Sequence, residues 1–177
     1  ASFRIGSARE TDTNAGIDDA RRANALRETS MNDLNGYDAE DLKPGMSATF
    51  SKTITEADIV LFAAVSGDNN AVHVNEEFAA TTQFGGRIAH GILTASVISA
   101  AIANQLPGPG TIYLGQQLRF KAPVRPGDTV HACVTVVSVD LAKARVVLST
   151  TCEVRGTVVI EGEETVMTTS SARRAKV

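Results

Sequence analysis

The fold is decided by residues 66–73, Ser-Gly-Asp-Asn-Asn-Ala-Val-His, and residues 89–103, Ala-His-Gly-Ile-Leu-Thr-Ala-Ser-Val-Ile-Ser-Ala-Ala-Ile-Ala. The second stretch has no Asp, Glu, Lys or Arg, and its large apolar side chains lie all round a helical wheel. A helix that is apolar on every side is expected to be buried. Because Thr and Ser interrupt this one, and Pro107-Gly108 follows it, we expect a core helix rather than a bilayer span.

Composition favours one globular domain without a nucleic-acid partner. The chain has 177 residues, 43% of them hydrophobic, which is enough for one core. Its net charge of -3 supplies no basic field for nucleic acid. Cys133 and Cys152 lie in strand-like stretches without a CxxC motif, so we expect two free thiols in a reducing cytoplasm.

Residues 1–36 differ from the rest of the chain. The first 30 residues carry five Arg, five acids and few large apolar side chains, so they cannot form a core of their own. We expect residues 1–36 to be an extension or a leader, with Met31 as one candidate start, although an arm that docks on the domain is the alternative. Residues 37–177 are expected to form the single domain.

Cap and turn residues predict the elements before the long helix. A first strand is expected over residues 47–54. Thr55 and Asp58 form a capping-box pattern for the next helix, and Gly67 suits its C-terminal end. Asn75 precedes a short helix over residues 76–82, and the long helix is expected over residues 90–105.

Beyond Pro107 the sequence pattern changes from helical to strand-like. The expected strands have alternating apolar and polar residues, and they cover residues 112–120, 130–136, 145–155 and 158–168. Together with the first strand they predict an α+β fold, in which an antiparallel sheet carries helices on one face and the longest helix is buried against it.

Three blocks of sequence carry a family resemblance. They are Phe62-Ala-Ala-Val-Ser-Gly-Asp-Asn-Asn-Ala-Val-His73, then His90-Gly91, and then Tyr113-Leu-Gly-Gln-Gln-Leu-Arg-Phe-Lys-Ala-Pro-Val-Arg-Pro-Gly-Asp128. In this order and spacing the chain resembles the MaoC-like (R)-specific enoyl-CoA hydratases over about residues 37–170. It departs from the family pattern at Ala71, where the family has proline, and this change is expected to free the backbone of the loop.

The resemblance implies a hotdog fold, in which an antiparallel β-sheet wraps around a long central helix and two copies form a homodimer. It implies reversible hydration of trans-2-enoyl-CoA to (R)-3-hydroxyacyl-CoA in fatty acid metabolism, including the supply of polyhydroxyalkanoate precursors. Asp68 and His73 match the catalytic pair of the family, and Gly91 matches its oxyanion donor. Asn70 and Ser99 match positions of the substrate site. No metal and no cofactor are expected, since coenzyme A is part of the substrate.

These residue types suit the addition of water to an enoyl thioester. The reaction needs a base, an acid and a donor to the thioester oxygen. Asp68 and His73, five residues apart, can hydrogen-bond one water, and Gly91 at the start of a helix offers a free N–H. Each also has a structural interpretation: Asp68 and Asn70 as turn residues, Gly91 as a packing position, and Ser99 as a donor to its own helix.

Three further groups are assigned less directly. His90 is expected to fix the start of the long helix by hydrogen bonding rather than to react. His131 is expected to be exposed. A basic cluster either meets the phosphates of coenzyme A or belongs to a solvated strand edge, and it consists of Arg119, Lys121 and Arg125.

Three other functions compete with the hydratase. An acyl-CoA thioesterase of related hotdog families commonly carries its carboxylate on the long helix, where this chain has none. A 3-hydroxyacyl-ACP dehydratase of the same family stays open. A non-catalytic acyl-binding partner is disfavoured, since Asp68 and His73 are both present.

Overall fold

The computed structural model describes residues 36–174, so the expected extension over residues 1–36 lies, except for Gly36, outside them. The strands are β1 (Ser47–Thr53), β2 (Ile112–Phe120), β3 (Thr129–Asp140), β4 (Arg145–Val154) and β5 (Thr157–Met167). The helices are α2 (Glu56–Ser66), α3 (Ala71–Val74), α4 (Glu76–Ala80), α5 (Gly91–Asn104) and α6 (Ser171–Arg174). The predicted strands and the three predicted helices are confirmed, with ends shifted by a few residues.

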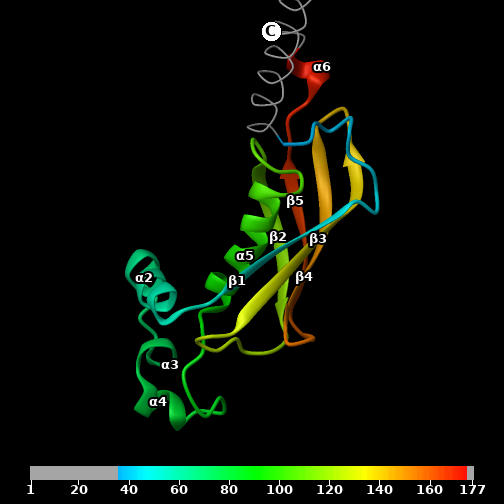
Figure 1. Ribbon diagram of the computed structural model, residues 1–177. Coiled ribbons are helices and arrows are strands. Elements are labelled where there is room, and N and C mark those ends of the chain that lie inside the picture. The colour runs from blue at the N-terminus through cyan, green and yellow to red at the C-terminus, as the bar shows by residue number, and fades with distance from the viewer. Residues whose placement is uncertain (1–35, 175–177) are drawn as a thin grey trace, which may run out of the picture. The chain divides into compact units, whose positions relative to one another are not determined.

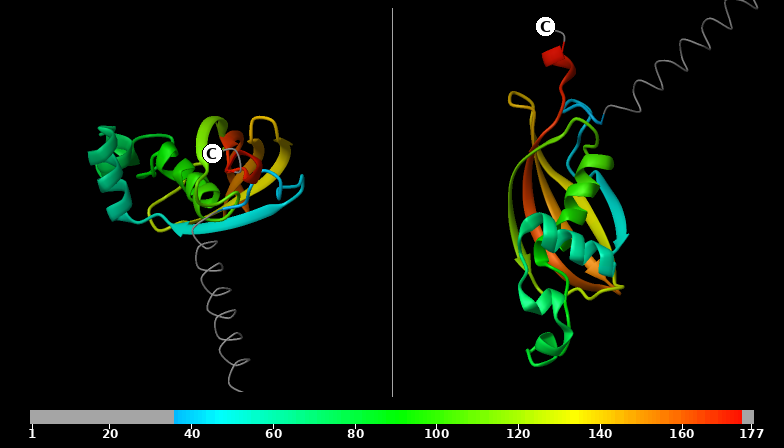
Figure 2. Two further views of the ribbon diagram at one scale, coloured as in Figure 1. Left: turned by 90° about the horizontal axis from the view of Figure 1, so that it is seen from above. Right: turned by 90° about the vertical axis from the view of Figure 1, so that its left-hand side faces the viewer.

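The five strands form one antiparallel sheet in the order β1-β3-β4-β5-β2. Its middle strands alternate between buried and exposed residues, as β4 shows over its whole length. One face therefore belongs to the core, and α5 lies across that face while the sheet curves around it (Figures 1 and 2). The predicted α+β architecture, with a sheet wrapped around a long helix, is confirmed.

Helix α5 is buried on most of its surface, but not on every side. Its buried residues include Leu93, Val97, Ile98 and Ile102, which join the main core cluster. A stripe at helical spacing remains exposed in the single chain, and it consists of Ile92, Ser96, Ser99 and Ala103. The prediction of a helix buried all round is therefore wrong for one chain, because the sheet covers only the face of α5 that is turned toward it.

The segment between β1 and α5 extends beyond the end of the sheet, where α2, α3 and α4 gather (Figure 1). The capping box of Thr55 and Asp58 is present at the start of α2, and Gly67 ends that helix with φ +77°. Helix α3 was not predicted, because four residues are too few to show a helical period. Its one local signal is Asn70, whose side chain accepts a hydrogen bond from Val72 N.

The predictions for the cysteines and for membrane-spanning helices can also be compared with the structure. Cys133 and Cys152 are free thiols on β3 and β4, as expected. Among residues 36–174, no helix combines the length and the apolar character that crossing a bilayer requires.

Glu164 is a fully buried carboxyl group in the described part of the chain. Glu164 on β5 has no exposed surface, and Thr150 Oγ1 donates a hydrogen bond of 3.0 Å to its Oε1. Its Oε2 is buried without a hydrogen-bond partner among the described residues. Burial raises the pKa of Glu164 from 4.5 to about 7, because the apolar surroundings disfavour the charged form.

We expect Glu164 to make the fold less stable at pH 8 than at pH 5. Between pH 4.5 and about 7 the unfolded chain releases the proton that the native state keeps, so stability falls as pH rises. The lost contribution is up to about 3 kcal/mol. Glu164→Gln should remove this pH dependence, as measured by urea unfolding at both pH values.

The matched control is Glu163→Gln, which changes the exposed neighbouring carboxylate on the other face of β5. This control should keep most of the pH dependence of the wild type, because burial is the largest cause of the raised pKa of Glu164 and the charge of Glu163 is a smaller one. An unchanged pH dependence in Glu164→Gln would contradict the assignment.

Candidate active site

Three functional side chains from separate segments meet beside the first turn of α5. Asp68 follows α2, His73 lies on α3, and His90 is the N-cap residue of α5. One carboxylate oxygen and one nitrogen of each ring lie within 4.8 Å of one another. Asp68 is exposed, whereas His73 and His90 are 8% and 1% exposed. The fold thus brings the two predicted catalytic residues together and adds a second histidine.

The end of α2 sets the position of Asp68. Gly67 ends the helix in the left-handed backbone conformation, which residues other than glycine rarely adopt. Asp68 N then donates to Ser66 Oγ at 3.1 Å, and Asp68 Oδ1 accepts from Asn70 N at 3.2 Å. These bonds leave the second carboxylate oxygen available to a ligand.

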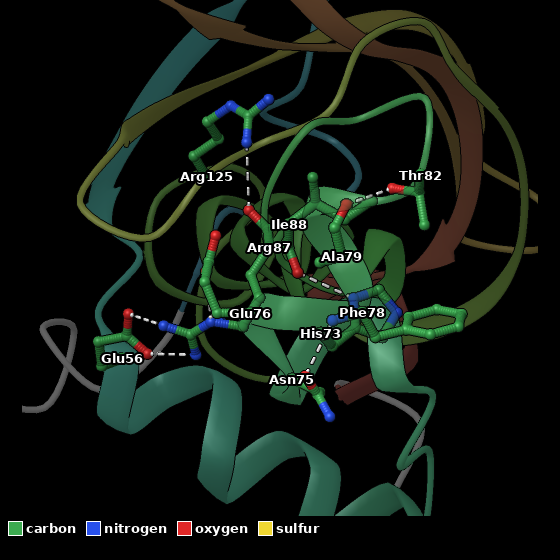
Figure 3. Close-up of polar contacts among 10 residues, drawn as sticks. All are labelled: Glu56, His73, Asn75, Glu76, Phe78, Ala79, Thr82, Arg87, Ile88 and Arg125. Carbon is green, nitrogen blue, oxygen red and sulfur yellow. Dashed lines mark hydrogen bonds and ion pairs between the residues drawn. The ribbon is translucent and has the colours of Figure 1, made fainter.

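The hydrogen bond of His73 determines which nitrogen can accept a proton. His73 Nδ1 lies 2.8 Å from the carbonyl oxygen of Ile88 (Figure 3). A carbonyl oxygen only accepts, so Nδ1 carries the hydrogen, and in the neutral ring the lone pair is on Nε2. His73 belongs to the short helix α3, in which its side chain and that of Val72 are buried.

His90 joins the start of α5 to the Asp68 loop. Its Nε2 donates to the carbonyl oxygen of Asp68 at 2.9 Å, and its ring centroid lies 3.9 Å from that of His73 and 4.9 Å from that of Phe62. Its Nδ1 is buried and has no hydrogen-bond partner among the described residues. His90 stands at the start of α5 and makes a hydrogen bond, as predicted, but its side chain does not cap the helix and instead bonds the backbone of Asp68.

The same three residues are the candidate ligands for a metal ion in the described chain. A metal lies in the plane of each imidazole that binds it, about 2.1 Å from the nitrogen. The rings of His73 and His90 are stacked and tilted by only 31°, so they are poorly arranged to bind one ion together. The geometry suits proton transfer better than metal binding.

Two cavities meet at Gly91. One, of about 260 Å³, has mostly apolar walls and contains His73 and Thr94. The other, of about 390 Å³, contains Asp68 and His90. Gly91 and Phe120 line both cavities, and a Cβ atom at position 91 would lie 2.8 Å from Phe120 Cε1. A side chain at position 91 would therefore require the half-exposed ring of Phe120 to shift.

The structure places the remaining predicted residues elsewhere. Asn70 caps α3, and Ser99 is exposed two turns along α5 from Gly91. In the basic cluster, Lys121 pairs with Glu161 and also lines the smaller cavity, whereas Arg125 donates to the carbonyl oxygens of Phe84 and Arg87.

The sequence analysis did not predict some of the residues that form the site. Phe120 was seen only as a strand residue, and the contact that brings it onto Gly91 joins two segments far apart in sequence. The Ile88 carbonyl is a backbone group without any sequence signal. His131 is exposed, as predicted.

Comparison with known proteins agrees with this geometry. Residues 40–158 match the MaoC like domain family. The chain belongs to the MaoC-like family. An (R)-specific enoyl-CoA hydratase of Rhodospirillum rubrum is 56% identical over 138 residues, which cover 78% of this chain and 96% of that protein.

Two solved MaoC-like structures have the same fold as this chain. Unliganded R-hydratase PhaJ1 of Pseudomonas aeruginosa is 46% identical with a TM-score of 0.72, over 78% of this chain and 89% of that one. The (R)-hydratase of Aeromonas caviae involved in PHA biosynthesis is 42% identical with a TM-score of 0.70, over 73% and 98%. The resemblance inferred from the sequence is confirmed.

The departure from the MaoC-like pattern at Ala71 falls on the first residue of α3, a position that accepts proline and alanine alike. Its carbonyl accepts from Asn75 N at 2.9 Å, and the Asn70 cap holds the preceding turn. Hydrogen bonds therefore hold the backbone on both sides of residue 71, and the expected freeing of the loop stays a prediction.

We expect His90→Asn to destabilise the MaoC-like domain by about 2–3 kcal/mol, because it removes a buried hydrogen bond and the packing against two rings. Urea unfolding at pH 7 measures this loss. His131→Asn is the control, since His131 is exposed and bonds only Ser51 Oγ in the described chain. The His131→Asn change should lower the free energy of unfolding by less than about 1 kcal/mol. Equal losses in both variants would contradict a stabilising role for the buried contacts of His90.

Proposed function

We propose that this protein is an (R)-specific enoyl-CoA hydratase, which adds water reversibly to trans-2-enoyl-CoA to give (R)-3-hydroxyacyl-CoA. The observation that carries the proposal is the approach of Asp68 and His73 to within 4.8 Å beside an apolar cavity that begins at Gly91. A cavity of about 260 Å³ with mostly apolar walls suits an acyl chain, and His73 lines it.

In the proposed mechanism one water is held between Asp68 and His73. The carboxylate and the His73 Nε2 lone pair are both acceptors, so each receives one hydrogen of the water. The water oxygen attacks C3 while one member of the pair takes a proton, and C2 then gains a proton from the pair. The sum is one water added across the double bond, with hydrogen and hydroxyl on the same face.

Negative charge that develops on the thioester oxygen is stabilised, in this proposal, by the N–H of Gly91. Gly91 is the first residue of α5, so its N–H lies outside the hydrogen-bond ladder of the helix. The positive end of the helix dipole adds to this effect. Asn70 contributes by capping α3 and so holding the turn that joins Asp68 to His73.

A 3-hydroxyacyl-ACP dehydratase would use the same chemistry in reverse on a different carrier. Assays with crotonyl-CoA and with a crotonyl acyl-carrier protein distinguish the two proposals by their kcat/KM ratio. The mechanism requires no cofactor, since the thioester is the only activating group it uses.

We expect Asp68→Asn and His73→Gln each to lower the turnover of crotonyl-CoA by roughly 100- to 10,000-fold, since each removes a partner in proton transfer. The double variant should be scarcely worse than either single one, because residues that act as a unit are not additive. Loss of absorbance of the enoyl thioester measures the rate, and circular dichroism verifies that the variants fold.

The product should be the (R)-3-hydroxy isomer. Chiral analysis that gives the (S)-isomer, or release of free coenzyme A without hydration, would refute the hydratase proposal. Near-normal turnover of crotonyl-CoA by Asp68→Asn would refute the proposed mechanism but would not contradict the hydratase reaction.

We also propose that the protein acts as a homodimer. β2 is an edge strand whose outer side lacks a strand partner in the single chain, and Ile112, Leu114 and Phe120 on it are about half exposed. The exposed stripe of α5 presents Ile92 as well. A second copy that pairs with β2 would cover such an edge.

Light scattering at micromolar concentration should therefore give twice the mass of one chain. Backbone amides of β2 that do not bond to β5 should also exchange slowly with deuterium, because a second strand protects them. A single-chain mass with rapid exchange along that edge would exclude the dimer.

A further inference from the structure

One segment without regular structure connects α4 to α5 and carries the acceptor of the His73 hydrogen bond. It runs over residues 84–90 and contains Gly85 and Gly86, both with positive φ. The Ile88 carbonyl in this segment is the group that receives His73 Nδ1–H at 2.8 Å. The orientation of His73 therefore depends on where a backbone without helix or strand bonds is held.

The side chain of Arg87 ties this segment to two helices. Its Nη1 and Nη2 donate to the two carboxylate oxygens of Glu56 at 2.9 and 2.7 Å, and its Nε donates to Glu76 Oε2 at 3.0 Å. Figure 3 shows the guanidinium between these carboxylates, with Ile88 next in the chain beside His73. Glu56 and Glu76 are the first residues of α2 and α4, so one planar group joins three elements around the catalytic loop.

Backbone contacts hold the segment from its other side. Arg125 donates to the carbonyl oxygens of Arg87 and Phe84, and Ile88 N donates to Val72 O at 3.3 Å. A Cβ atom at Gly86 would lie 3.0 Å from Glu76 Oε1, so the glycine lets the carboxylate approach the segment closely. The Ile88 carbonyl is thus fixed from several directions, and the Arg87 side chain supplies the contacts to α2 and α4.

The ion pairs of Arg87 matter for the orientation of its guanidinium rather than for the stability of the fold. Exposed ion pairs contribute about 0–1 kcal/mol, and Glu56 and Glu76 are 56% and 63% exposed. A bidentate fork onto a carboxylate nevertheless fixes the orientation of the guanidinium, which a single point charge does not. The side chain of Arg87 itself is only 22% exposed.

We propose that Arg87 is a positioning residue for His73. By holding residues 84–90 against α2 and α4, it keeps the Ile88 carbonyl where it receives Nδ1–H, and so leaves the Nε2 lone pair of His73 free beside Asp68. This inference rests on the proposed hydratase function for its kinetic consequence, but its structural consequence can be measured without any substrate.

The test compares Arg87→Gln and Arg87→Lys with Lys52→Gln. Lys52 pairs with Asp58 in the first turn of α2, so its removal breaks a similar ion pair of the same helix without touching residues 84–90. Arg87→Gln should lower kcat for crotonyl-CoA by roughly 10- to 100-fold, as misplacement of a reacting group does. KM should change less than about 2-fold, since the substitution leaves unchanged the contacts that bind substrate equally in the ground state and the transition state.

A second measurement follows the tautomer of the His73 ring. In protein labelled with nitrogen-15 histidine, the wild type should show His73 protonated on Nδ1, with His73→Gln identifying its signals. Arg87→Gln should mix the two tautomers, and Lys52→Gln should not. Arg87→Lys should recover only part of the turnover, because an ammonium cannot form the fork with Glu56.

The outcomes separate the two proposals. If the wild type does not hydrate crotonyl-CoA but Arg87→Gln still changes the tautomer of His73, positioning stands and the hydratase function fails. If the wild type is active and Arg87→Gln changes neither kcat nor the tautomer, or only as much as Lys52→Gln, positioning is overturned. Should Arg87→Gln fail to fold, Glu56→Gln and Glu76→Gln test the same two contacts one at a time.

Discussion

The burial of α5 on the concave face of the sheet is the constraint on which the rest of the structure depends. The helix carries no formal charge, and its apolar residues join β3, β1 and β4 in one core cluster. Once α5 lies there, its first residues stand beside the loop that follows α2 and beside α3. The Asp68 carboxylate and the rings of His73 and His90 then meet as a consequence of packing.

Local sequence patterns predicted the elements but only part of the site. Alternation identified the strands, and the Thr55 capping box and Gly67 identified the ends of α2, because each signal lies within a few neighbouring residues. The contacts of His90 with Asp68 and of Phe120 with Gly91 could not be predicted, since each joins segments that are distant in sequence. Asp68 and His73 came from the family motif rather than from physical signals alone.

The failure of one prediction is informative about assembly. A helix without charges was expected to be buried all round, yet α5 leaves a stripe exposed that includes Ile92, which is 54% exposed. Exposed apolar residues also lie on the edge strand β2. The absence of charge along a helix therefore does not show which of its faces the rest of the same chain covers, and this exposed stripe is one of the observations behind the proposed homodimer.

Both histidines of the site are oriented by backbone carbonyls rather than by carboxylates. His73 Nδ1 donates to Ile88, and His90 Nε2 donates to Asp68. A carbonyl oxygen only accepts a hydrogen bond, so it sets the orientation of the ring and, in the neutral ring, which nitrogen carries the hydrogen. Asp68 is the one carboxylate of this cluster, and neither ring takes its orientation from it. The position of both rings therefore depends on backbone geometry and on the side chains that hold that backbone.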